Sequence, residues 1–88
     1  MKITTQKQLD NLVSRLRPGD ICHVTGGPVC AGRKLFRPGR QTFIGVVSPG
    51  ALQFEPGGLV FPLAKSETVT YEPYSITRNR VLRKNVHK

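Results

Sequence analysis

The chain has 88 residues, enough for one domain with a thin hydrophobic core. It carries 14 Lys and Arg residues against 5 acidic residues, a net charge of +9, and its 2 cysteines are too few for a disulfide framework. No apolar stretch is long enough to span a bilayer, and residues 1–10 lack the apolar segment of a secretory signal. We therefore expect a cytoplasmic protein with no membrane partner.

Residues 5–17 are predicted to form a helix. Thr5, followed three residues later by Gln8, has the pattern of a capping box, and Pro18-Gly19 ends the helical pattern. One apolar face recurs at helical spacing and consists of Leu9, Leu12, Val13 and Leu16. We expect this face to pack on the core of the domain.

Beyond Gly19 the apolar residues alternate with polar ones, which predicts short strands joined by glycine- and proline-rich turns. Gly26-Gly27-Pro28 is interpreted as one of these turns, and Gly45 as a bulge or bend inside a strand. The predicted strands are 20–25, 41–48, 51–55, 59–64 with Leu59, Phe61 and Leu63 on one face, and 68–72, with Pro73 separating a last short segment at 74–77.

Five short strands and one small helix bury a core only if the sheet curls into a barrel. The predicted fold is therefore mainly β with one N-terminal α-helix. It is a small five-stranded antiparallel SH3-like barrel over about residues 20–77, with the helix at one end, within a single domain of residues 1–77.

The sequence R-P-G-D-I-C-H-V-T-G-G-P and the later run from Thr42 to Glu72 carry a family resemblance at the level of pattern. They resemble the small SH3-type barrels, including KOW and Sm-like domains. Gly19-Asp20 matches the pair that opens the first strand in those families, and Phe43 to Leu63 matches their bent middle hairpin. Residues 31–40 intervene where the KOW pattern expects a second strand. The resemblance implies a fold, because such barrels bind nucleic acid in some families and proteins in others.

Positive charge is concentrated in two segments, residues 33–40 with four bases and residues 78–88 with five. The remaining residues sum to zero, since +2 in residues 1–32 offsets −2 in residues 41–77. Localised positive charge attracts polyanions. We therefore predict non-catalytic binding of nucleic acid, either DNA or RNA, with both segments on one face. The candidate phosphate contacts are Arg33, Lys34, Arg37, Arg40, Arg78, Arg80, Arg83 and Lys84.

Phe36 lies inside the first basic segment and is a further candidate for nucleic-acid binding. An exposed Phe36 would stack on an unpaired base or act as a wedge. The same segment, formed as a β-ribbon, would enter the groove of a duplex. Alternatively, Leu35 and Phe36 anchor a solvated loop to the core. The sequence leaves these interpretations open.

Residues 78–88 are predicted to be a basic C-terminal arm. Extended as a strand, the arm would place Arg78, Arg80 and Leu82 on one face, whereas a helix capped by Thr77 would gather a weak apolar stripe. If it forms neither a strand nor a helix by itself, the arm would become ordered when it binds phosphate.

The sequence predicts no enzyme, no metal site and no cofactor. Cys22 and His23 are neighbours in a predicted strand, so their side chains point to opposite faces and cannot form an activated pair. Cys30 lies too far along the chain for a zinc knuckle, and Cys22 is expected to be buried and inert beside Val24. The alternative function is a protein-interaction module, or a small accessory or inhibitory protein, that docks on an acidic partner protein. The oligomeric state is left open.

Overall fold

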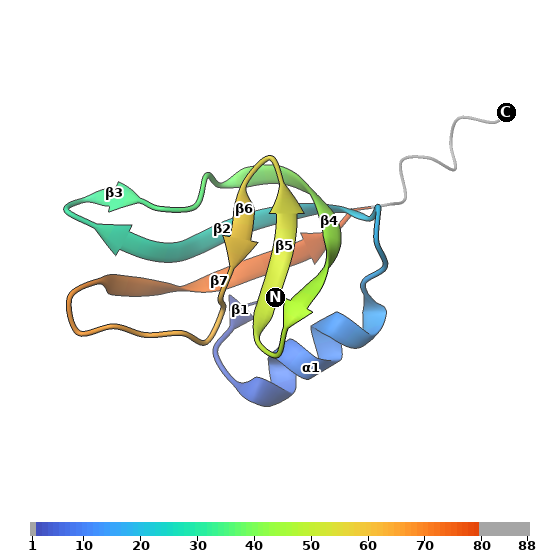
Figure 1. The fold of residues 1–88 in the computed structure, drawn as a ribbon, viewed down its shortest axis with the longest axis horizontal. Coiled ribbons are helices and arrows are strands. Elements are labelled where there is room, and N and C mark those ends of the chain that lie inside the picture. The colour runs from blue at the N-terminus through green and yellow to red at the C-terminus, as the bar shows by residue number, and fades with distance from the viewer. Residues whose placement is uncertain (1, 80–88) are drawn as a thin grey trace, which may run out of the picture.

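The computed structural model describes residues 2–79 as one antiparallel sheet with a single helix (Figure 1). The sheet has seven strands in the order β1-β7-β2-β4-β5-β6, and β3 pairs with β2 outside this order. Within the described residues the sheet does not close, because β1 and β6 lie at its two ends. The elements in chain order are β1 (Lys2–Ile3), α1 (Gln6–Arg15), β2 (Ile21–Cys30), β3 (Arg33–Lys34), β4 (Gly39–Ser48), β5 (Ala51–Glu55), β6 (Gly58–Val60) and β7 (Thr70–Arg78).

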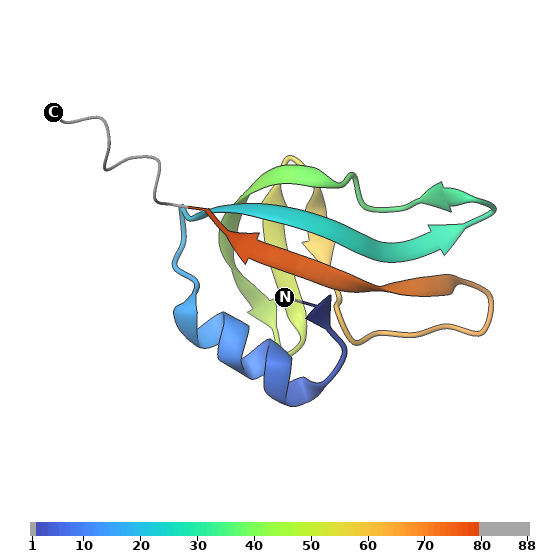
Figure 2. The same cartoon turned by 180° about the vertical axis from the view of Figure 1, so that it is seen from behind.

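The hydrophobic core lies inside the curl of the sheet, where β4, β5 and β6 lie across β2 and β7 (Figures 1 and 2). Aromatic rings pack within it, with Phe54 on β5 in edge contact with Phe43 on β4 at 5.5 Å between ring centroids. Helix α1 adds its apolar face to the same cluster. Its members include Leu9, Leu12, Leu16, Val24, Phe43, Leu52, Phe54, Val60, Tyr74 and Ile76.

The predicted capping box of α1 is confirmed. Gln8 N–H donates to the Thr5 hydroxyl at 3.2 Å, and Thr5 N–H donates to the Gln8 side-chain oxygen at 3.1 Å. These two bonds satisfy donors that the first helical turn otherwise leaves unpaired. The helix ends at Arg15, two residues before the predicted end, and Leu16 is its C-cap.

The predicted turn at Gly26-Gly27-Pro28 is wrong, because β2 continues through these residues to Cys30. The pairing of β2 with β7 shifts register between Thr25 and Gly27. At Gly26, whose φ is +85°, an added Cβ would lie 2.2 Å from the Pro73 carbonyl oxygen. The glycines therefore allow close approach of β7 and do not reverse the chain. Pro73 does not separate two strands as predicted, because β7 continues through it.

The strand count differs from the predicted five because β1 and β3 are added and residues 70–78 form one strand. The predicted strand at 59–64 is reduced to β6, and its inward residue is Val60, while Leu59 is exposed. The predicted irregularity at Gly45 is confirmed by a register shift between Phe43 and Gly45. These shifts bend β4, which helps the sheet to curl.

Candidate nucleic-acid interface

The first basic segment, residues 33–40, runs antiparallel to β2 along its length. Arg33 is paired with Cys30 near the tip of the β2–β3 hairpin, and Arg40 is paired with His23 further back along the strand. Its four cationic side chains, those of Arg33, Lys34, Arg37 and Arg40, are all exposed. The segment therefore presents positive charge along one long side of the molecule.

Phe36 fixes this segment to the core. Its side chain is 3% exposed and makes edge-to-face contacts with Phe54 at 6.3 Å and Tyr74 at 6.2 Å. The prediction that Phe36 stacks on a base is therefore wrong, since the ring has no free face. The alternative interpretation, a core anchor, holds for Phe36 alone, because Leu35 is 61% exposed.

Gln41, which follows the segment, also fixes its backbone. The buried side chain donates from Nε2 to the Arg37 carbonyl at 3.0 Å. Its Oε1 accepts from Gly57 N–H at 2.7 Å, which ties the segment to the turn between β5 and β6. Two buried side chains, the Phe36 ring and the Gln41 amide, thus fix the backbone around Arg37.

A shallow depression of about 510 Å³ lies between the segment and the β5–β6 turn. Its lining combines two cations with two prolines and a glycine backbone, contributed by Lys34, Leu35, Arg37, Pro38, Pro56 and Gly57. Cationic side chains beside a rigid backbone suit an anionic ligand.

Acidic neighbours neutralise only part of this charge. Lys34 forms an ion pair with Glu72 on β7. Among residues 2–79, Arg33, Arg37 and Arg40 have no acidic side chain within ion-pair distance. Their charge is therefore available to a ligand.

Arg78 is placed differently from its prediction as an exposed residue of a C-terminal arm. It belongs to β7, where its guanidinium donates to the Arg15 carbonyl at the end of α1 and lies 3.7 Å from the Asp20 carboxylate. Asn79 N–H also donates to the Ile21 carbonyl, so the described chain stays attached to the sheet up to this residue. Arg78 therefore joins the helix to the sheet.

Arg33 of the first basic segment and Arg78 of the second lie far apart, because they are paired with residues near opposite ends of β2. Arg78 is paired with Cys22, and Arg33 is paired with Cys30. Eight residues of extended strand separate these positions by about 26 Å. The predicted contacts Arg80, Arg83 and Lys84 lie outside the described residues.

His23 lies beside Arg40, but the sequence does not predict it as part of this interface. From the sequence alone, His23 is considered only as the partner of Cys22 in an activated pair, which the alternation of the strand excludes. Its register position opposite Arg40 depends on the pairing of β2 with β4. Only the alternation of residues 20–25 indicated that its side chain faces away from Cys22.

The two cysteines differ in exposure, and Cys22 is buried as the sequence predicts. Its side chain is fully buried, and burial, together with the nearby Asp20 carboxylate, raises the pKa of the thiol to about 11. Cys30 is exposed. Within the described part of the chain no three metal-ligating side chains gather at one place.

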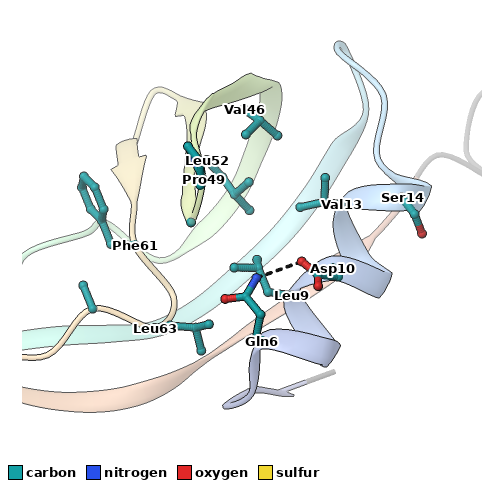
Figure 3. A pocket seen from close by; sticks show the side chains of 12 residues that line it. Gln6, Leu9, Asp10, Val13, Ser14, Val46, Pro49, Leu52, Phe61 and Leu63 are labelled. Carbon is teal, nitrogen blue, oxygen red and sulfur yellow. Dashed lines mark hydrogen bonds between the residues drawn. The ribbon is translucent and has the colours of Figure 1, made fainter.

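A second surface, an apolar groove of about 570 Å³, lies between α1 and the hairpin of β4 and β5 (Figure 3). Leu9 and Val13 line it from the helix, and Val46, Phe61 and Leu63 line it from the sheet side. Asp10 is the one charged residue of its lining. The groove therefore offers apolar contact and no positive charge.

Comparison of the chain with protein-family models, with curated proteins and with solved structures gave no match. Among the described residues, α1 is too short and too polar to cross a membrane.

Proposed function

We propose that this protein binds nucleic acid without catalysing a reaction, and that the basic segment at residues 33–40 holds the phosphates. The observation that carries the proposal is the exposure of Arg33, Arg37 and Arg40 on a backbone fixed by Phe36 and Gln41. Guanidinium groups donate two parallel hydrogen bonds to a phosphate. A fixed backbone lowers the conformational entropy lost on binding.

Charge alone supports the inclusion of Arg80, Arg83 and Lys84, which add to the long-range attraction of a polyanion. Arg78 is left out of the proposed contacts because its guanidinium is engaged at the end of α1.

We also propose that the curled sheet is an incompletely closed barrel of the SH3 type. The register shifts that bend β4 and the position of α1 beside one end of the curl support this assignment (Figure 1). The fold assignment carries no weight in the functional proposal.

The test is a fluorescence-anisotropy titration of the full chain with labelled single-stranded RNA, single-stranded DNA and duplex DNA. Each titration is done at about 50 and 200 mM salt, because phosphate contacts release counterions and make affinity fall steeply with salt. We expect binding that weakens by orders of magnitude at the higher salt. A folded sample that binds none of the three probes contradicts the proposal.

A pair of double variants separates the segment from general charge. Arg37→Ala with Arg40→Ala removes two proposed phosphate contacts and should reduce the salt slope by about 2. Lys7→Ala with Lys65→Ala removes the same charge from exposed positions on α1 and on the loop before β7. Equal effects of the two double variants would mean that the segment is not the site.

The alternative function, docking on an acidic protein, would use the same cations. The apolar groove does not favour it, since the groove holds no cation. Acidic-protein docking predicts a stoichiometric complex with that partner and little affinity for free polynucleotide.

A further inference from the structure

The outward face of the sheet carries a row of polar side chains across three strands. His23 on β2 is paired with Arg40 on β4 and with Thr77 on β7. Directly paired residues of an antiparallel sheet place their side chains on the same face. All three side chains are exposed, whereas the neighbouring Cys22 and Val24 are fully buried on the core face.

A second row lies beside the first on the same face. Thr25 on β2 is paired with Ser75 on β7, and Ser75 is paired with Lys2 on β1. Figure 2 looks onto β2 and β7 from this side, with β5 and β6 behind them. With strands about 4.8 Å apart, each row extends about 10 Å across the sheet.

The chemistry of the two rows is that of a phosphate-binding surface. Arg40 and Lys2 carry positive charge, Thr77, Thr25 and Ser75 offer hydroxyl donors, and His23 offers an imidazole N–H. Neither row contains an acidic residue. The nearest carboxylate on this face is that of Glu55, which is paired with Thr42 in the row beyond His23.

We propose that His23 and Arg40 form a phosphate-binding subsite on this open face, and that protonation of His23 strengthens the binding of nucleic acid. The inference rests on the proposed function and adds to it a residue and a pH dependence. The charged groups facing His23 are Arg40 from β4, with Lys2 and Glu55 one row away; β7 places the uncharged Thr77 beside it.

The direction of the pH dependence follows from linkage. The ordinary pKa of histidine, about 6.5, lies between pH 5.5 and pH 8. A bound phosphate favours the charged form of a neighbouring imidazole, so binding that involves a histidine takes up a proton. Affinity should therefore rise as pH falls. A rise of one pKa unit corresponds to a gain of up to about ten-fold.

The chain permits a clean control because it contains only two histidines, His23 and His87. The affinity of the full chain for a labelled single-stranded DNA and for the duplex of the same sequence is measured from pH 5.5 to 8 at fixed ionic strength. The native chain and His87→Gln should gain affinity at low pH, and His23→Gln should not. Arg40→Gln should weaken binding at every pH.

Each outcome separates this inference from the proposed function. Binding that is independent of pH in the native chain, or a pH dependence that survives in His23→Gln, overturns the inference and leaves the proposed function standing. Absence of binding to both probes at every pH contradicts the proposed function itself. The pKa of His23 measured by NMR should rise when the tighter-binding probe is added, and an unchanged value would also overturn the inference.

Discussion

The side-chain oxygen of Gln41 accepts a hydrogen bond from the backbone N–H of Gly57, 16 residues further along the chain. The same side chain donates to the Arg37 carbonyl, so one buried amide joins β4, the basic segment and the β5–β6 turn. Gly57 has to be glycine here, since an added Cβ would lie 2.4 Å from the Phe36 ring. The basic segment is therefore held by the core from which it projects.

Replacement of Gln41 by Met should destabilise the protein by about 2 kcal/mol, because it removes two partly buried hydrogen bonds and leaves the Arg37 carbonyl and the Gly57 N–H without this partner. The free energy of unfolding in urea measures the change. Gln53→Met is the control, since the half-buried Gln53 side chain makes no hydrogen bond to the other residues of the described range. Equal losses in the two variants would contradict the role assigned to Gln41.

The close approach of β2 and β7 can be tested with two glycines that share a left-handed conformation. Gly26 has φ +85° and Gly32 has φ +81°, but only Gly26 has backbone atoms within 4 Å of an added Cβ. Gly32→Ala should lower the free energy of unfolding by about 1 kcal/mol, because alanine is strained at this left-handed φ. Gly26→Ala should lose at least about 2 kcal/mol more, because the Cβ meets the Pro73 carbonyl. Thermal unfolding compares the two, and similar melting temperatures would show that β7 can move aside.

Local patterns in the sequence predicted the parts of the fold that depend on local interactions. The capping box at Thr5, the apolar face of α1 and the burial of Cys22 all follow from residue types at fixed spacing. The alternation of residues 51–55 likewise predicted β5.

The parts that sequence reasoning missed depend on contacts between distant segments. A glycine that permits a turn and a glycine that permits close packing look the same in a sequence, so Gly26-Gly27 predicts a turn where the structure has a close approach of two strands. The burial of Phe36 depends on rings contributed by β5 and β7. The place of His23 beside Arg40 depends on strand register, which a one-residue slip would reverse.

Arg78 should contribute to stability and not to nucleic-acid binding. Arg78→Met removes a charged donor to the Arg15 carbonyl and a cation near Asp20, so a loss of about 2 kcal/mol is expected. Arg37→Met should change stability by less than about 0.5 kcal/mol, because this side chain is exposed.

The affinity for nucleic acid should show the reverse order. Arg37→Met should bind more weakly than the native chain, and Arg78→Met should bind as tightly as the native chain. Urea unfolding and anisotropy titrations on the same samples give both measurements. A loss of affinity in a fully folded Arg78→Met variant would return Arg78 to the interface.

The two thiols should differ in reactivity. At pH 8 a thiol reagent should modify one cysteine of the folded chain rapidly, because Cys30 is exposed. Cys22 should react only after unfolding, since it is fully buried and burial raises the pKa of its thiol to about 11. Cys30→Ser should abolish the rapid phase. Two rapid equivalents in the native chain would mean that the core opens readily around β2.

Stability should fall in alkaline solution. Burial raises the pKa of Cys22 from 9.0 to about 11 and that of Tyr74 from 10.0 to about 12. Below about pH 8 both groups are mostly neutral in the folded and unfolded chains. Above it the unfolded chain loses these protons first, so the free energy of unfolding decreases as pH rises through this range. Urea midpoints between pH 8 and 11 should decline, and Cys22→Ala should show a shallower decline than Cys30→Ser. A midpoint that stays constant to pH 11 would contradict the burial of both groups.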